Sequence, residues 1–180
     1  MSLTKLSEIF IREMTKDDIQ DVAAIEEEVY GRHHWSKSAF YDEMSNDIAK
    51  YYTAKTSCGE IAAYAGTWHI IDEGHITTIA VQKKFWRNHI GEALISRIIE
   101  DCYRNEIKYL TLEVRVSNIP AIKLYEKYGF QSLGTRKQYY QDNNESALIM
   151  WTENIFYDKF KLKYNENILK LKGVIDIKNE

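Results

Sequence analysis

The sequence predicts one α/β (α+β) domain, with a mostly antiparallel sheet of six to seven strands flanked by about four helices. A chain of 180 residues with 44% hydrophobic residues is long and apolar enough for one sizeable core. Segments of alternating apolar residues, which are typical of strands, are interleaved with segments of helical spacing. Between residues 51 and 82, turn-forming residues separate three strand segments, which indicates an antiparallel meander.

The first third of the chain is expected to form one short strand and then two helices. Thr15, with an acidic residue three positions on, is a suitable start for the first helix, and Ser36 for the second. Between the two helices lie the acidic run 26–28 and a loop that starts at Tyr30. These residues either form a solvated surface or line the binding site of an acceptor molecule.

One segment in the second half of the chain changes its period midway. Alternating apolar residues predict a strand over residues 109–116, with Glu113 off its apolar face. A helix follows, because Asn118 is a suitable N-cap and apolar residues, Tyr125 among them, recur at helical spacing. Gly129 is then expected to end the helix.

The remaining elements complete the domain. A charged loop over residues 82–89 separates the meander from another helix. Such a strand-loop-helix arrangement lets backbone N–H groups converge on an anion. Residues 131–139 and 146–151 are expected to form a last antiparallel pair. We place the domain at residues 1–151 and expect residues 152–180 to be an extension, helical and then frayed.

Composition excludes several classes of protein. A net charge of −3 with dispersed Lys and Arg does not give the basic surface of a nucleic-acid binder, and no apolar run approaches a membrane span. Cys58 and Cys102 form no metal-ligand spacing, and neither does the pair His33 and His34. We therefore expect a cytoplasmic protein with reduced cysteines, no metal, and neither nucleic acid nor membrane as a partner.

Residues 118–130 carry the pattern N-x-x-A-x-x-L-Y-E-K-x-G-F, which resembles the acetyl-CoA-dependent N-acetyltransferases of the GNAT superfamily. The run L-E-V-R-V-S-N at 112–118, with Arg136, Tyr139-Tyr140 and E-S-A-L-I-M at 145–150, is similar to the ribosomal-protein alanine N-acetyltransferases and archaeal N-terminal acetyltransferases of that superfamily. The resemblance extends over roughly residues 9–151. It implies a mixed GNAT sheet that splays between residues 79–81 and 112–116 to hold the ligand.

The resemblance also implies that acetyl-CoA is the co-substrate. GNAT enzymes hold its pyrophosphate on the backbone of a Q/R-x-x-G-x-G/A motif, of which only Gly91 remains, because Trp86 and His89 occupy the other two positions. A histidine in place of the first glycine costs roughly a kcal/mol if its φ is positive and nothing if its φ is helical. The implied acetyl-CoA contacts are Ile79, Ala80, Val81, Arg87, Asn88, His89, Ile90, Gly91, Glu92, Asn118 and Tyr125.

Acetyl transfer to an amine requires a base for the amine proton and an acid for the departing thiolate. By resemblance, Glu113 is the base, acting through water, and Tyr125 is the acid. From the residues alone, Glu113 fits equally well an ion pair with a Lys or Arg on a neighbouring strand, and Tyr125 a core aromatic. Asn118 can likewise be a helix cap, a contact of the coenzyme, or both.

The resemblance implies transfer to the N-terminal α-amine of a protein, either a ribosomal protein or another nascent chain. Tyr139 and Tyr140 are the implied peptide-binding residues, and Tyr30 joins them if the loop after the acidic run lines the acceptor side of the site. Two alternatives remain open: a small-molecule amine N-acetyltransferase and a non-catalytic module that binds acyl-CoA. The tyrosine pair argues against the first alternative, and the presence of both Glu113 and Tyr125 argues against the second.

Overall fold

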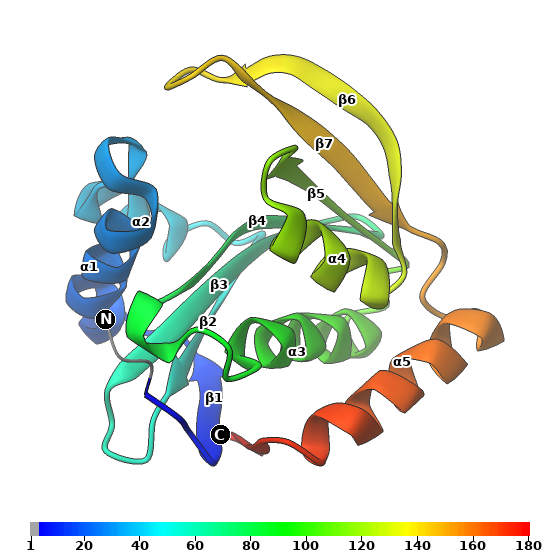
Figure 1. Ribbon diagram of the computed structural model, residues 1–180, viewed down its shortest axis with the longest axis horizontal. Helices are drawn as coiled ribbons and strands as arrows, with labels where there is room; N and C mark the ends of the chain where they lie inside the picture. The colour runs from blue at the N-terminus through cyan, green and yellow to red at the C-terminus, as the bar shows by residue number, and fades with distance from the viewer. Residues whose placement is uncertain (1–3) are drawn as a thin grey trace.

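The computed structural model describes residues 4–180, which form an eight-stranded mixed sheet with helices on both faces (Figure 1). The strands lie in the order β6-β7-β5-β4-β3-β2-β1-β8. Neighbouring strands are antiparallel except for two parallel pairs, β4 with β5 and β1 with β8. The predicted fold class is confirmed, and the sheet has one strand more than expected.

The strands are β1 (Glu8–Glu13), β2 (Ala49–Lys55), β3 (Ile61–Ile70), β4 (Glu73–Val81), β5 (Tyr109–Arg115), β6 (Phe130–Tyr140), β7 (Glu145–Thr152) and β8 (Asp176–Asn179). The α-helices are α1 (Ile19–Tyr30), α2 (Lys37–Glu43), α3 (Ile90–Arg104), α4 (Ile119–Lys127) and α5 (Asp158–Lys172). Short 3-10 turns at Lys16–Asp18, Gly31–His33 and Lys83–Phe85 precede α1, α2 and α3.

The sheet separates two hydrophobic cores. On one face, α1 and α2 pack over β2, β3 and β4, with Phe40 against the rings of Tyr51 and Tyr64. On the other face, α3 contributes the buried residues Leu94 and Ile98 to a larger core that also includes residues of α5. Figure 1 shows the β6–β7 hairpin arching beyond α4, so that β6 has its backbone at the edge of the sheet.

Local capping explains where the helices begin and end. Thr15 and Asp18 form the expected capping box, although the first turn after Thr15 is 3-10 and α1 itself begins at Ile19. The side chain of Asn118 accepts a hydrogen bond from the backbone N–H of Ala121 at 3.3 Å, as an N-cap does. Gly129 has φ +89°, a left-handed conformation that terminates α4.

The C-terminal segment does not end in the frayed coil that we expected. After α5, residues 176–179 pair in parallel with β1, which would otherwise be the edge of the sheet. Phe160, Tyr164 and Leu171 of α5 are buried in the larger core. Their side chains recur on one helical face, so burial of that face holds the segment against the domain.

Candidate active site

A gap in the sheet between β4 and β5 is the framework of the site. Parallel pairing of the two strands stops at Ile76 with Leu112, because a β-bulge at this point of β4 turns its later residues away from β5. The backbone of Ile79 and Val81 beyond the bulge therefore faces a gap in the sheet. The hydroxyl of Tyr30 donates to the carbonyl of Ile79 at 2.9 Å, which brings the end of α1 to this edge.

The loop before α3 supplies the second part of the site. Arg87 and His89 both have positive φ, at 65° and 59°, and His89 is the N-cap of α3. His89 therefore has the positive φ that costs energy and not the helical φ that would cost none. Its Nδ1 lies 3.0 Å from a carboxylate oxygen of Glu92. The first-turn N–H groups of α3 have no intrahelical partners and face the loop, which suits an anion.

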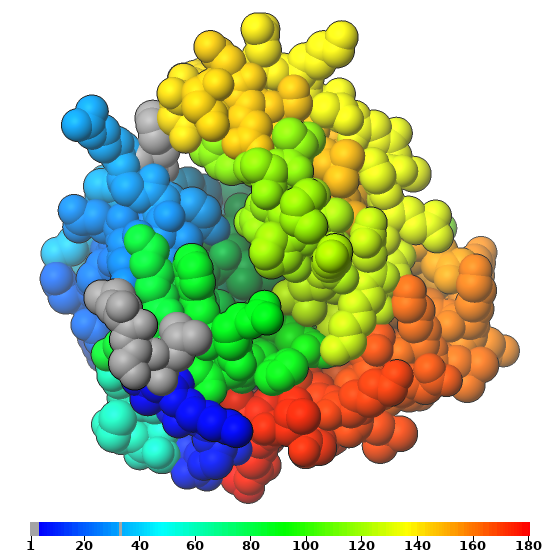
Figure 2. All heavy atoms as spheres, in the orientation of Figure 1, coloured from blue at the N-terminus to red at the C-terminus, as the bar shows by residue number. Residues whose placement is uncertain are grey.

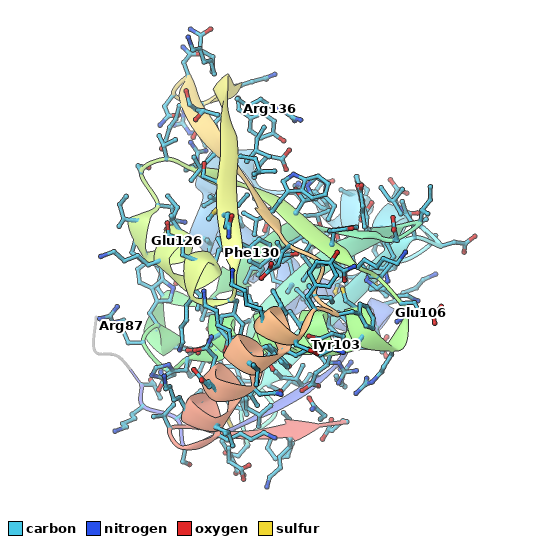
Figure 3. All side chains as sticks on the ribbon, turned by 90° about the vertical axis from the view of Figure 1, so that its right-hand side faces the viewer. Arg87, Tyr103, Glu106, Glu126, Phe130 and Arg136 are labelled. Carbon is cyan, nitrogen blue, oxygen red and sulfur yellow. The ribbon has the colours of Figure 1, made fainter. Side chains whose placement is uncertain are left out.

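The side chains of this loop divide into outward and inward groups. Arg87 is exposed, and Figure 3 shows it below α4, whereas Arg136 of β6 lies at the top of the view. Asn88 is buried, and its amide bonds the backbone of Thr4, Leu6 and Phe85. The side chain of Asn88 therefore anchors the loop, and only its backbone remains available to a ligand.

Glu92 connects the start of α3 to the end of α4. Its buried carboxylate accepts hydrogen bonds from Lys127 and from the hydroxyl of Tyr128, the latter at 2.9 Å, in addition to the contact with His89. Burial raises the pKa of Glu92, but these donors outweigh burial and leave the pKa below its ordinary value. The Glu92 side chain is therefore engaged in the protein, and the backbone N–H is what it can offer to a ligand.

Glu113 lies on β5 between the imidazole of His75 and the guanidinium of Arg136. One carboxylate oxygen lies 2.7 Å from Nε2 of His75 on β4, and the other lies 3.2 Å from the guanidinium of Arg136 on β6. The hydrogen bond with His75 lowers the pKa of Glu113 against the opposing effect of burial, and the charge of Arg136 lowers it further. The residues alone suggested an ion pair with a neighbouring strand, whereas Glu113 pairs with Arg136 of β6, which β7 separates from β5 in the sheet.

His75 is a candidate functional residue that the sequence did not reveal. The parallel register of β4 and β5 pairs His75 with Thr111, two residues before Glu113 and on the same face. The His75 ring also packs edge-to-face with the indole of Trp68, with ring centroids 6.3 Å apart. In the sequence, His75 shows only that it lies near the start of a predicted strand. Its contact with Glu113 can be foreseen only once the register of β4 and β5 is known.

Three tyrosines from distant segments converge on the gap. Burial raises the pKa of Tyr125 on α4 well above its ordinary value, and the neighbouring phenols of Tyr30 and Tyr140 raise it further. Burial likewise raises the pKa of Tyr30 to about 12 and that of Tyr140 to about 12. All three hydroxyl groups therefore keep their protons at neutral pH. Tyr139 is half exposed beside them, with its ring 5.1 Å from that of Tyr140.

Arg115 fastens the β6–β7 hairpin over the site. Its guanidinium lies 3.8 Å from the ring centroid of Tyr140 and forms ion pairs with Asp142 at 2.8 Å and Glu145 at 3.2 Å. Glu145 also accepts a hydrogen bond from the backbone N–H of Ser117 at 2.8 Å. The hairpin that carries Tyr139 and Tyr140 is thus tied to the junction of β5 and α4. Figure 2 shows a hollow between α1–α2 and the region formed by α4 and this hairpin.

The acidic run at the end of α1 divides into residues with different environments. Glu26 is 3% exposed and accepts hydrogen bonds from the hydroxyl of Tyr64 and the backbone N–H of Trp35. Burial raises the pKa of Glu26 despite these donors. Glu27 is exposed, and Glu28 accepts a hydrogen bond from the N–H of Lys83 at 3.3 Å. The run therefore braces the loops beside the gap.

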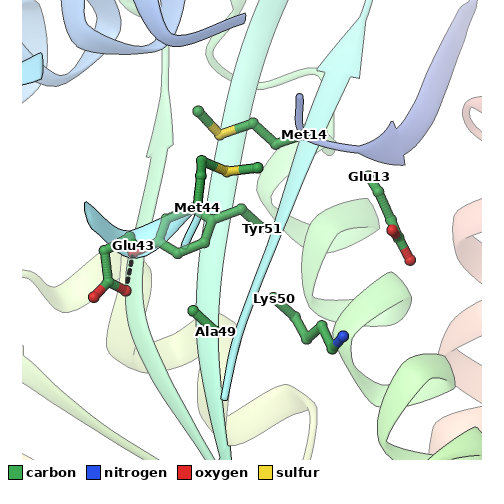
Figure 4. Close-up of a pocket in the computed structure, with 7 residues that line it drawn as sticks. All are labelled: Glu13, Met14, Glu43, Met44, Ala49, Lys50 and Tyr51. Carbon is green, nitrogen blue, oxygen red and sulfur yellow. Dashed lines mark hydrogen bonds between the residues drawn. The ribbon is translucent and has the colours of Figure 1, made fainter. Parts of the chain in front are cut away.

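Among residues 4–180, a cavity away from the gap and a grouping of possible metal ligands are two other places where a site could lie. A cavity of about 100 Å³ between α2 and β2, lined by Met14, Met44 and Tyr51 among others, contains none of the site residues (Figure 4). Within residues 4–180, no three His, Cys, Asp or Glu side chains are grouped in a way that could hold a metal ion. None of the helices in this range is both long and apolar enough to cross a bilayer.

Residues 9–130 match the model of the acetyltransferase (GNAT) family. A Bacillus subtilis (strain 168) protein, named provisionally as a ribosomal protein bS18-alanine N-acetyltransferase, is 40% identical over 141 residues, which cover 78% of this chain and 93% of that protein. The ribosomal-protein-S18-alanine N-acetyltransferase from Escherichia coli superposes with a TM-score of 0.75 at 30% identity, covering 81% of this chain and 94% of that one. Ard1 from Thermoplasma volcanium superposes with a TM-score of 0.73 at 25% identity, over 81% of this chain and 97% of that one.

These matches extend across the strands and helices that form the gap between β4 and β5, and they confirm the resemblance drawn from residues 112–150. The chain therefore belongs to the GNAT acetyltransferase family and is an N-acetyltransferase.

Proposed function

We propose that this protein transfers the acetyl group of acetyl-CoA directly to the N-terminal α-amine of a protein, with Glu113 as base and Tyr125 as acid. The observation that carries the proposal is the position of these two groups: a carboxylate on β5 and a protonated phenol on α4, both beside the splayed edge of β4. The relatives named for acetylation of an alanine in ribosomal protein bS18 support an α-amine acceptor. We propose a ribosomal protein or another nascent chain as the substrate.

Acetyl-CoA fits the residues that surround the gap. Along the edge of Ile79, Ala80 and Val81, the carbonyls of Ile79 and Val81 already accept from the Tyr30 hydroxyl and the Trp86 indole, so the edge offers backbone N–H groups to the extended arm of the coenzyme. The first turn of α3, from His89 to Glu92, offers backbone N–H groups to its pyrophosphate, and the exposed Arg87 offers a positive charge. We assign Asn118 mainly to the cap of α4, since its side-chain oxygen is already engaged there.

Glu113 is suited to receive a proton at neutral pH because its carboxyl group is ionised there. An α-amine has a reference pKa of about 7.7–8.0, whereas that of lysine is about 10.4. The difference makes a lysine harder to deprotonate at neutral pH by roughly 3.5 kcal/mol, at 1.36 kcal/mol per pKa unit. A carboxylate that acts through water is therefore better matched to an α-amine. His75 holds one oxygen of Glu113, which leaves the carboxylate with a fixed orientation.

Tyr125 is suited to the opposite role. Its raised pKa keeps the phenol protonated, so the hydroxyl can donate to a departing thiolate, whose reference pKa is about 8.5. The hydroxyl forms no hydrogen bond with another residue in the described part of the chain, so no protein acceptor competes for its proton. Its ring packs against Phe130, with centroids 5.7 Å apart, which fixes the direction of the hydroxyl.

The peptide is expected to enter between α1 and the β6–β7 hairpin. Tyr30 at the end of α1 and Tyr140 at the end of β6 both lie near Tyr125, and the half-exposed ring of Tyr139 packs against that of Tyr140. The tyrosine hydroxyl groups can form hydrogen bonds with the backbone of an extended peptide. The size of the peptide side chains then determines which peptides fit. We propose acceptance of a first residue as small as Ala or Ser.

A competition within one peptide tests the proposed function. The peptide begins with Ala, contains an internal lysine, and is incubated with labelled acetyl-CoA before mass spectrometry. We expect the label on the α-amine. Acetylation of the lysine alone, or turnover with free polyamines and not with peptides, would reject the proposed acceptor.

A further inference from the structure

The middle of α3 contains a buried cation with few protein partners. Arg97 is 6% exposed, yet no carboxylate among residues 4–180 lies within 4.0 Å of its guanidinium, and its Nε has no hydrogen-bond partner there. Its contacts are the face of the Tyr52 ring at 5.1 Å and the amide oxygen of Asn179 at 3.5 Å, the outer limit of a hydrogen bond. Buried arginines are ordinarily paired, so Arg97 keeps strong donors available to another acceptor.

The guanidinium borders a small cavity between α3 and the C-terminal segment. The cavity has a volume of about 70 Å³, several times the roughly 10–15 Å³ that a single water needs. Its polar lining consists of Ser96, Arg97 and Glu100 from α3, Lys172 from α5 and Asn179 from β8. Two of these side chains are cationic and one is anionic, so the cavity has a net positive charge.

The single carboxylate does not neutralise Arg97. Glu100 lies 4.0 Å from Arg104, one turn further along the helix, and not within that distance of Arg97. Asp101, one turn beyond Arg97 on α3, is buried and lies 3.7 Å from Nε2 of His69, but it is not within 4.0 Å of Arg97. Within the described residues, Arg97 and Lys172 both line the cavity, and neither has a carboxylate within 4.0 Å of its cationic group.

We propose that this cavity binds a small oxyanion of the phosphate or sulfate type. A guanidinium presents N–H donors in a fork that matches two oxygens of a tetrahedral anion, and an ammonium adds a second charge. The amide of Asn179 provides a further donor from the opposite wall. The apolar side chains of Ala93, Ile168 and Ile177 complete the lining, and they limit the ligand to this size.

The anion fastens the C-terminal segment to α3. Arg97 and Ser96 belong to the region that matches the family model, whereas Lys172 and Asn179 lie beyond its last matched residue, 130. A ligand that contacts both α3 and the C-terminal segment binds only the folded chain, in which the two lie together. It therefore stabilises the fold by mass action. The site is separate from the acetyl-CoA gap and does not depend on the proposed acceptor.

Thermal unfolding in a phosphate titration tests the site, with sodium chloride adjusted to keep ionic strength constant. We expect the Tm of the wild-type protein to rise by roughly 3–6 °C when phosphate reaches about ten times its Kd. Arg97→Met and Lys172→Ala should lose this rise. Lys170→Ala, which removes an equal charge from the same helix outside the cavity, should keep it. Lys172→Ala changes an exposed side chain, so it tests the site even if Arg97→Met does not fold.

A second anion site is the main competing explanation, because phosphate can also bind at the start of α3. Arg87→Ala removes the cation there and should leave the rise in Tm intact. A rise that disappears with Arg87→Ala and persists with Lys172→Ala would overturn the inference. An equal rise in every variant, or no rise in the wild-type protein, would overturn it as well.

Discussion

The substitution Tyr125→Phe separates a role in acid catalysis from a role in packing. It removes the hydroxyl and keeps the ring, which lies 5.7 Å from that of Phe130. Because the hydroxyl bonds no other residue of the described chain, its loss should change the free energy of unfolding by less than about 0.5 kcal/mol. If the phenol donates its proton in the transition state, kcat should fall roughly ten- to a thousandfold, or about 1.4–4 kcal/mol in activation free energy.

Tyr128→Phe is the matched control, since it makes the same change one turn further along the chain. The hydroxyl of Tyr128 donates to Glu92 at 2.9 Å, and the residue is 2% exposed. Loss of a hydrogen bond to a charged acceptor costs on the order of 1.5–3 kcal/mol, which lowers Tm by roughly 3–12 °C for a chain of this size. The control should therefore lose stability and retain kcat at temperatures where it is folded.

The assay is steady-state kinetics with the Ala-terminated peptide, together with calorimetric binding of acetyl-CoA and thermal unfolding for both variants. Tyr125→Phe should lower kcat with little effect on acetyl-CoA affinity or on Tm. An unchanged kcat would return Tyr125 to the role of a packing aromatic. An equal loss of kcat in folded Tyr128→Phe would show that helix position, not the phenolic proton, limits the reaction.

Three further changes test other parts of the site and the fold. Glu113→Gln should lower kcat about a hundred- to ten-thousandfold. The pKa of Glu113 is below its ordinary value, so the carboxylate is already ionised at pH 5 and the wild-type rate between pH 5 and 9 should rise only with deprotonation of the acceptor amine. A second rise near pH 6 that Glu113→Gln abolishes would contradict the lowered pKa of Glu113. His89→Gly should bind acetyl-CoA at least as tightly as wild type in calorimetry, since glycine accepts a φ of 59° without strain; a tenfold weaker affinity would mean that the imidazole itself contributes. Gly129→Ala should lower Tm by roughly 2–8 °C, because the residue has φ +89° and its new β-carbon would lie 2.9 Å from the ring of Phe160, whereas Gly134→Ala meets no atom within 4 Å and should unfold like wild type.

The sequence by itself determined the elements whose signals are local. The strand and helix of residues 109–127 follow from alternation, from the cap at Asn118 and from the glycine at 129, because each signal acts within a few residues of its own position. The same stretch carries Glu113 and Tyr125, so both candidate catalytic groups could be named before any contact was known. Tyr140 was named by resemblance and Tyr30 from its place in the loop after the acidic run, and the phenols of both lie near that of Tyr125.

Only the tertiary structure decided the partners of these residues. His75 meets Glu113 because of the parallel register of β4 and β5, and a register is a property of two strands that neither strand encodes alone. The positive φ of His89 depends on how its loop spans from β4 to α3, so composition left both conformations open. The last residues read as a frayed end because they are polar and short, yet they pair with β1, since the exposed edge of that strand offers backbone groups that a local pattern does not display.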